Sequence, residues 1–221
     1  MSDPAAALAA ILRQRRPEAF ATWLADASLA AGASFDRTAF ELAFAGAGRR
    51  FGTDTIGGGI TLTGASGRAW SIAGWGLDDA ARALLVLGAV AVIPEAAQPG
   101  FVDDLYRAGA SRERRALLRA LALLPDPQRF LATALDACRT STLPVFEAIA
   151  CENPYPAECF PKPRFNQMAL KAVFTGIAVD RILLLATRRS GELARMAADY
   201  AAERRAAGRP VPADLALLGA P

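Results

Sequence analysis

Apolar residues recur every three or four positions along most of the chain, which is the spacing of helices that bury one face. In the first third of the chain this spacing predicts helices over residues 5–14, 17–31 and 37–50. Asp36 stands where the N-cap of the third helix is expected, and Gly32 follows the second helix as its stop. The N-terminal third is therefore expected to be largely helical.

The helical periodicity resumes near residue 80 and continues to residue 207, interrupted by prolines and glycines that end helices. Consecutive short helices favour an all-α fold. They form either an α-solenoid of antiparallel pairs, similar to HEAT or armadillo arrays, or an irregular helical bundle. No repeated sequence motif separates the two. The expected helices cover residues 80–93, 99–108, 112–124, 128–139, from 140 or 142 to 151, 164–188 and 191–207.

The pattern changes in the glycine-rich stretch 52–76. Apolar and polar residues alternate at 60–63 and 68–72, on either side of the turn-forming stretch 64–67, which predicts a small β-hairpin. The glycine run at 57–59 lacks the lysine and the Ser/Thr of a phosphate-binding loop. A linker or tight turn is therefore favoured there over nucleotide binding.

The chain has 221 residues, 53% of them hydrophobic, and is expected to form one soluble helical domain, 1–221. Within it we distinguish an N-terminal part, 1–94, with the glycine-rich segment, and a C-terminal part, 95–221. The longest apolar run, 83–94, is shorter than the roughly 20 residues that cross a bilayer. The N-terminus has an acidic residue before its basic ones, the reverse of a signal peptide. A cytoplasmic protein is expected.

The chain contains no histidine, which excludes Ser-His-Asp and Cys-His catalysis and histidine-ligated metals. Cys138, Cys151 and Cys159 are too few and too irregularly spaced for a disulfide framework or a zinc site. We therefore expect reduced thiols, no metal and no cofactor. The net charge is +3, but basic and acidic residues alternate along the helices, so nucleic-acid binding is not expected.

Polar and aromatic residues gather in the proline-rich segment 151–167, between two strongly helical stretches. Its four prolines are incompatible with a helix interior or a central strand, so a fixed, extended turn is expected. Such a turn can present side chains to a ligand at low entropic cost. The predicted ligand-binding residues in and beyond this segment are Glu152, Asn153, Tyr155, Arg164, Asn166, Gln167, Lys171 and Asp199.

Several of these candidates have an alternative structural role. Asn153 precedes a proline and suits a turn, and Asn166 can cap a helix. Tyr155 can pin the segment to the core, and Glu152 can be a solvated loop carboxylate.

The grouping with the clearest chemistry is Arg164, Gln167 and Lys171. Gln167 and Lys171 are four residues apart and share a helix face, and with Arg164 they can bind a phosphate or diphosphate. Asp199 forms an expected ion pair with Arg195, also four residues away. If their helix packs against the preceding one, these two can close a polar groove beside Lys171.

Four runs of sequence resemble the EboA family: FEAIACENPYPA at 146–157, FP at 160–161, FNQMALKAVF at 165–174 and MAADYAAERRAAGRPVP at 196–212. The resemblance extends over roughly 111–218. It implies a cytoplasmic accessory protein of a bacterial gene cluster associated with a prenylated cyclitol-type metabolite and with export of a scytonemin precursor. It implies no catalytic residues.

The favoured interpretation is a non-catalytic helical accessory protein of a secondary-metabolite pathway. It would hold a small-molecule intermediate or a partner biosynthetic enzyme near residues 151–171. The alternative is a metal-independent enzyme that uses Glu152, Tyr155 or Lys171 on a phosphorylated or prenylated small molecule. Nucleic-acid binding by the helical arginines is a third, weaker hypothesis.

Overall fold

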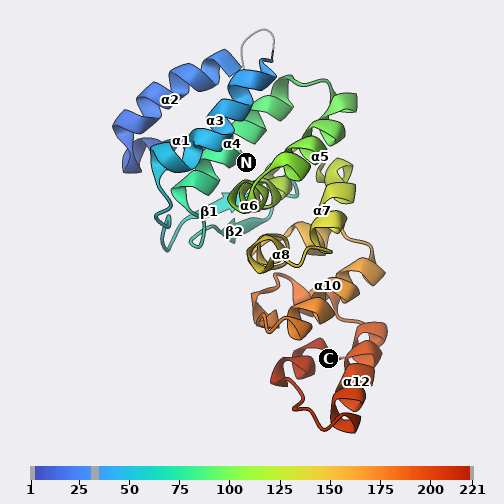
Figure 1. Cartoon of the computed structure of the whole chain (residues 1–221). Helices are drawn as coiled ribbons and strands as arrows, with labels where there is room; N and C mark the ends of the chain where they lie inside the picture. Colours follow the sequence, from blue (N-terminus) through green and yellow to red (C-terminus); the bar gives the residue numbers. More distant parts are fainter. Residues whose placement is uncertain (1–2, 31–34, 220–221) are drawn as a thin grey trace. The chain divides into compact units, whose positions relative to one another are not determined.

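The computed structural model describes residues 3–30 and 35–219, and it is mainly helical, as predicted (Figure 1). It divides into two compact units, Met1–Ala134 and Leu135–Pro221, here called unit 1 and unit 2. This division differs from the parts expected at 1–94 and 95–221. Folding of the whole chain as one domain, and an α-solenoid arrangement of its helices, stay predictions. The predicted end of the second helix, at residues 31–32, lies outside the described residues.

Helix α4 lies at the centre of unit 1, where it contacts α1, α3 and α6, while α2 packs against α1 and α3 (Figure 1). Asp36 caps α3 as predicted, because its carboxylate accepts a 3.1 Å hydrogen bond from the Ala39 N–H. The helices of unit 1 are α1 (Pro4–Arg15), α2 (Pro17–Ala30), α3 (Arg37–Phe51), α4 (Leu77–Val92), α5 (Gln98–Ala108) and α6 (Ser111–Ala120), with 3₁₀ turns η1 (Glu95–Ala97), η2 (Leu121–Leu123) and η3 (Pro127–Phe130).

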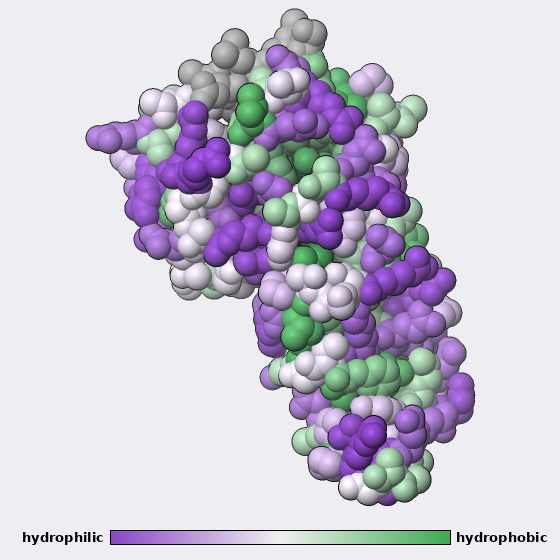
Figure 2. Space-filling model, viewed as in Figure 1, coloured by the Kyte–Doolittle hydropathy of each residue, from purple (hydrophilic) through white to green (hydrophobic). Residues whose placement is uncertain are grey.

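Most of the long apolar run of the sequence lies in α4, where Ala83, Val86 and Val90 are shielded from solvent as expected of a core-facing stripe, whereas Val92 is 44% exposed. Within the described residues, no helix combines the length and the apolar character needed to cross a membrane. Figure 2 shows hydrophilic residues over most of the visible face of unit 1, with apolar residues in small groups between them.

The predicted β-hairpin is confirmed. Strands β1 (Thr61–Thr63) and β2 (Ala69–Ser71) are antiparallel, and the paired residues Leu62 and Trp70 are both buried. Gly64 is required in the turn because a Cβ there would lie 2.6 Å from the Ala122 carbonyl oxygen. The hairpin is therefore fixed against the helical body of unit 1, which a two-stranded sheet needs for stability.

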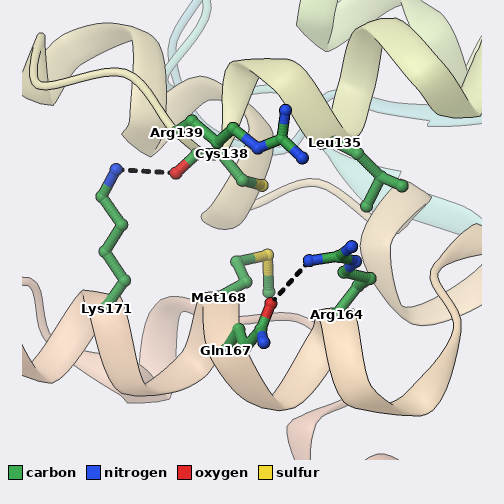
Figure 3. Close-up of a pocket in the computed structure, with 7 residues that line it drawn as sticks. All are labelled: Leu135, Cys138, Arg139, Arg164, Gln167, Met168 and Lys171. Atoms are coloured by element: carbon green, nitrogen blue, oxygen red, sulfur yellow. Dashed lines mark hydrogen bonds between the residues drawn. The ribbon is translucent and has the colours of Figure 1, made fainter.

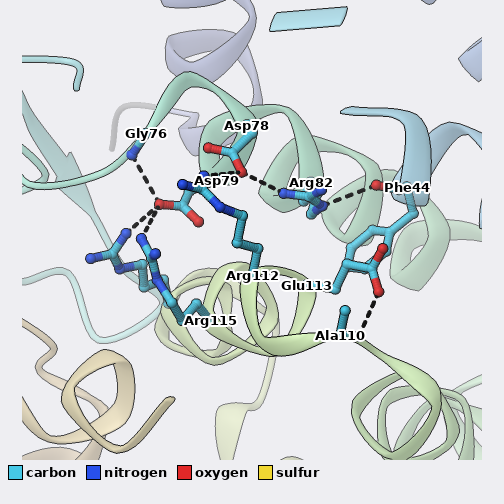
Figure 4. Close-up of polar contacts among 10 residues, drawn as sticks. Phe44, Gly76, Asp78, Asp79, Arg82, Ala110, Arg112, Glu113 and Arg115 are labelled. Atoms are coloured by element: carbon cyan, nitrogen blue, oxygen red, sulfur yellow. Dashed lines mark hydrogen bonds and ion pairs between the residues drawn. The ribbon is translucent and has the colours of Figure 1, made fainter. Parts of the chain in front are cut away.

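Asp78 and Asp79 are two buried carboxylates in the first turn of α4, and they pair with arginines of α4 itself and of α6 (Figure 4). Asp78 accepts hydrogen bonds from Arg82, at 2.7 Å, and from Arg112, at 3.4 Å. The Arg82 Nε also donates to the Phe44 carbonyl, at 3.0 Å, and so ties α4 to α3.

Asp79 is fully buried and has three donors on one oxygen: the Gly76 N–H at 2.9 Å, Arg115 at 3.3 Å and Arg119. Asp79 caps the start of this helix from inside the first turn, since its carboxylate accepts a hydrogen bond from the backbone N–H of Gly76. Its other oxygen, Oδ1, has no hydrogen-bond partner in the described part of the chain. The α4 ion cluster consists of Asp78, Asp79, Arg82, Arg112, Arg115 and Arg119.

In unit 2, helix α10 contacts α8, α12 and the turns η4 and η5. Large side chains from several elements fill the core around it, including Phe146, Tyr155 and Phe165. Helix α7 (Leu131–Ala137) begins in unit 1 and ends in unit 2. The other elements are α8 (Leu143–Ala150), α9 (Tyr155–Cys159), α10 (Lys162–Phe174), η4 (Val179–Arg181), α11 (Leu185–Arg188), α12 (Gly191–Ala206) and η5 (Ala213–Leu218).

Two predictions about this region were wrong. The expected helix over 164–188 ends at Phe174, because Gly176 adopts a φ of 74°, outside the helical region, and Thr175 bonds back to the Lys171 carbonyl. The proline-rich segment is not extended, since it contains the short helix α9. Pro156 is tolerated there because the first turn of a helix leaves its N–H groups without helical partners.

Candidate functional site

The start of the 151–167 segment is held by side-chain bonds to its own backbone. The Asn153 side chain is 3% exposed; its Nδ2 donates to the Ala148 carbonyl at 2.9 Å, and its Oδ1 accepts from the Tyr155 N–H at 3.0 Å. Tyr155 is fully buried and packs edge-on against Phe160. Both residues therefore have the turn-forming and core-packing roles that were the alternatives to ligand binding.

Glu152 is clamped by Arg181. The two side chains form a bidentate pair, with Nε–Oε1 at 2.7 Å and Nη2–Oε2 at 3.0 Å, and Arg181 also bonds Glu147 at 3.1 Å. Hydrogen bonding to Glu152 raises the pKa of Arg181 above its ordinary value. This ion pair joins the segment to the turn η4.

A second arginine, Arg188, holds the other end of α9. Its guanidinium donates to the carbonyls of Ala157 and Phe160, both at 2.6 Å, and lies 4.7 Å from the centroid of the Phe165 ring. Arg188 was not among the predicted site residues, because no local spacing in the sequence links position 188 to position 157. Arg181 and Arg188 lie outside the segment, and their hydrogen bonds hold its beginning and the end of α9 in place.

A pocket of about 130 Å³ lies in unit 2 between the end of α7 and one face of α10 (Figure 3). It brings together three of the predicted residues, Arg164, Gln167 and Lys171, from positions i, i+3 and i+7 of α10. The Arg164 guanidinium donates to the Gln167 Oε1 at 3.0 Å. This α7–α10 pocket is lined by Leu135, Cys138, Arg139, Arg164, Gln167, Met168 and Lys171.

Lys171 also has a structural role. Its ammonium donates to the Cys138 and Thr140 carbonyls, both at 2.6 Å, and lies 4.6 Å from the centroid of the Phe146 ring. Carbonyls at the end of a helix have no partner within it, and a lysine is a suitable donor for them. Lys171 therefore fixes the end of α7 while it places a positive charge at the wall of the pocket.

The wall that α7 contributes was not predicted. Arg139 is largely exposed, and its ion pair with Asp136 is long, at 3.8 Å. The Cys138 thiol has its pKa raised to about 12 by burial, although the Lys171 charge opposes this shift. Among the described residues that line the pocket, three are cationic and none is a carboxylate. Met168 lies four residues after Arg164 on the same helix face, so the spacing could have predicted that it lines the pocket. No spacing in the sequence links Arg139 to that face.

The remaining two candidates lie elsewhere. Asn166 is fully buried on the opposite face of α10, and neither atom of its amide has a partner in the described structure. Asp199 bonds Arg195 at 3.0 Å on the exposed side of α12, as the spacing predicted. The contact between α10 and α12 involves the rings of Phe174 and Tyr200, 4.3 Å apart, and within the described part of the chain Asp199 pairs with Arg195 and not with Lys171.

A family model described as metabolite traffic protein EboA matches residues 5–218. The match covers nearly the whole chain and so extends well beyond the region 111–218 in which the motifs were recognised. No curated protein sequence and no solved structure gives a significant match.

Proposed function

The chain belongs to the EboA family of metabolite traffic proteins, and we propose that it is a non-catalytic accessory protein that holds a small-molecule metabolite in the α7–α10 pocket. Its ligand would be an intermediate of a bacterial secondary-metabolite pathway, of the prenylated cyclitol type that the family resemblance implies. Its partners would be the biosynthetic enzymes that deliver or receive this intermediate in the cytoplasm.

The observation that carries this proposal is the charge of the pocket. Arg139, Arg164 and Lys171 face a common space without a lining carboxylate among the described residues. Cations with no carboxylate in close contact attract anionic ligands, and a partly enclosed site strengthens that attraction relative to open water. An anionic metabolite is therefore the ligand that this arrangement favours.

The bonding of the proposed catalytic candidates supports binding over catalysis. The Glu152 carboxylate is paired with Arg181, Tyr155 is fully buried, and Lys171 donates to two backbone carbonyls. Burial raises the pKa of both Cys138 and Cys151 to about 12, which disfavours the thiolate that a cysteine nucleophile needs. The alternative of a metal-independent enzyme would require one of these groups to be released on substrate binding.

Calorimetric titration of the full chain tests the proposal. Geranyl diphosphate and inositol monophosphate serve as probes, with geraniol and inositol as their uncharged counterparts. We expect at least one charged probe to bind, its uncharged counterpart to bind at least tenfold more weakly, and the double variant Arg139→Gln/Arg164→Gln to lose that affinity. Arg195→Gln, which changes an exposed arginine outside the pocket, is the matched control. Equal affinity in the double variant and the wild type would remove the pocket as the site.

A further inference from the structure

We infer that the α7–α10 pocket recognises a phosphate ester in its dianionic form, held by the guanidinium groups of Arg139 and Arg164 while Lys171 remains bonded to α7. This inference rests on the proposed function and specifies which chemical group of the metabolite is recognised. It distinguishes a phosphate ester from a carboxylate, which would also be attracted by a cationic pocket.

The first support is the availability of hydrogen-bond donors. A guanidinium has five N–H donors in a planar fork that matches phosphate geometry. Within the described structure, the Arg164 guanidinium makes one hydrogen bond, to Gln167, and Arg139 has only the long contact with Asp136. Lys171, in contrast, already makes two short bonds to carbonyls. The two arginines are therefore the groups with donors left for a ligand.

The second support is the amount of charge. Three cationic side chains line the pocket, and among the described residues the carboxylate that pairs with one of them is Asp136, 3.8 Å from Arg139. A carboxylate brings one negative charge and two oxygens, which a single arginine can satisfy. A phosphate ester brings up to two charges and three terminal oxygens, so it can engage two guanidiniums at once. The pocket matches the second ligand better.

The third support is size and lining. The pocket has a volume of about 130 Å³, whereas sites that enclose a drug-sized ligand have roughly 300–1,000 Å³. It can enclose a phosphate group, and the rest of the metabolite would extend beyond it. Leu135 and Met168 also line it, so the atoms next to the phosphate have an apolar surface to contact (Figure 3). This combination suits the ester end of an organic phosphate.

The composition of the chain supplies an unusually direct test. The second ionisation of a phosphate ester has a pKa of about 6, and histidine is the side chain that ordinarily titrates in the same range. The chain has no histidine. The charged and titratable groups at the pocket are Cys138, Arg139, Arg164 and Lys171, with Asp136 beside Arg139. A change in affinity between pH 5 and pH 7 would therefore report the ionisation of the ligand.

The experiment compares phenyl phosphate with benzoate, which has the same ring but a carboxylate that is already ionised at pH 5. Affinities are measured by NMR titration of the full chain at pH 5 and pH 7, at constant ionic strength and without phosphate in the buffer. We expect phenyl phosphate to bind about tenfold more tightly at pH 7, because its dianionic fraction rises by about that factor across a pKa of about 6. Benzoate should bind more weakly and change little.

Variants assign the effect to the pocket. Arg139→Gln/Arg164→Gln should abolish both the phosphate affinity and its pH dependence, whereas Arg195→Gln should leave both unchanged, with circular dichroism confirming the fold of each. Benzoate binding as tightly as phenyl phosphate, or pocket-dependent binding without a change between pH 5 and pH 7, would overturn this inference and leave the proposed function intact. Phosphate binding that the double variant retains would overturn the inference as well. If every charged probe also binds the double variant unchanged, the proposed function itself fails.

Discussion

The α4 ion cluster of unit 1 and the α7–α10 pocket of unit 2 both bring cationic side chains together, but they differ in what those cations face. In unit 1, four arginines converge on the two buried carboxylates Asp78 and Asp79. In unit 2, Lys171 bonds backbone carbonyls, Arg164 bonds an amide and Arg139 has only a 3.8 Å contact with Asp136, while no carboxylate is among the described lining residues. The first arrangement is internally paired, and the second is open to an external anion.

This difference shows why arginine content alone is a poor guide to function in this chain. The same residue type stabilises the packing of α4 against α6 in one unit and lines a cationic pocket in the other. Whether an arginine has a carboxylate partner decides between the two roles, since a paired buried charge has little attraction left for a ligand. The following predictions test that distinction.

The largest effect is expected in unit 1. Asp79→Ala removes a buried carboxylate that faces Arg115 and Arg119 and caps the Gly76 N–H. We expect a loss of about 3 kcal/mol in the free energy of unfolding, because partly buried guanidiniums lose their counter-ion. Urea denaturation followed by circular dichroism measures it. A loss no greater than that of an exposed aspartate would show that the cluster does not stabilise the fold.

A smaller loss is expected for Lys171→Met, which keeps the length of the side chain but removes its ammonium. Two bonds to the end of α7 disappear, and hydrogen bonds from charged groups contribute about 1.5–3 kcal/mol. We expect a decrease of about 2 kcal/mol in the free energy of unfolding. Lys162→Met, at the only other lysine of the chain, is the control and lies on the exposed start of α10. Equal stabilities of the two variants would mean that Lys171 does not cap α7.

Replacing the two buried asparagines of unit 2 is expected to change the free energy of unfolding in opposite directions. Asn153→Ala should lower stability by about 1 kcal/mol, because the side chain makes two good bonds to the backbone. Asn166→Leu should raise stability by about 1 kcal/mol, because its amide is buried without a hydrogen-bond partner among the described residues. Thermal unfolding of both variants gives the two signs. A destabilised Asn166→Leu variant would indicate that this amide has a partner after all.

The smallest effect is expected for Asp199→Ala. Its ion pair with Arg195 is exposed on both sides, and such pairs contribute about 0.5 kcal/mol or less. The same denaturation measurement should find a change near the limit of detection, and phosphate affinity should be unaltered. A loss of affinity in this variant would return Asp199 to the candidate site and weaken the assignment of the pocket.

Local sequence signals accounted for much of the secondary structure. Helical periodicity placed most helices, Asp36 marked the cap of α3, and alternation marked the hairpin with its paired Leu62 and Trp70. The two wrong predictions concern segments in which two local signals favour different structures. The apolar pattern beyond Phe174 suggested a continuing helix, but the turn at Gly176 ends it. The prolines suggested an extended segment, but their positions in a first turn allow α9.

The candidate site was predictable only in part. Arg164, Gln167 and Lys171 share a helix face, so their spacing alone places them together. Asn153 and Asn166 look equally polar in the sequence, yet Asn153 is bonded to the backbone and Asn166 is buried with no partner for its amide in the described structure. Nothing in their local sequence separates these two outcomes.

The sequence by itself determined the helical character of the chain, the hairpin, the absence of histidine chemistry and the cationic face of α10, because each depends on residues close together in the chain. The tertiary structure alone decided that Arg139 lines the same pocket as Arg164, that Lys171 reaches the end of α7, and that Arg181 clamps Glu152. Each of these contacts joins residues some 25 to 33 positions apart. Local periodicity carries no information at such separations, since only packing of the helices brings these residues together.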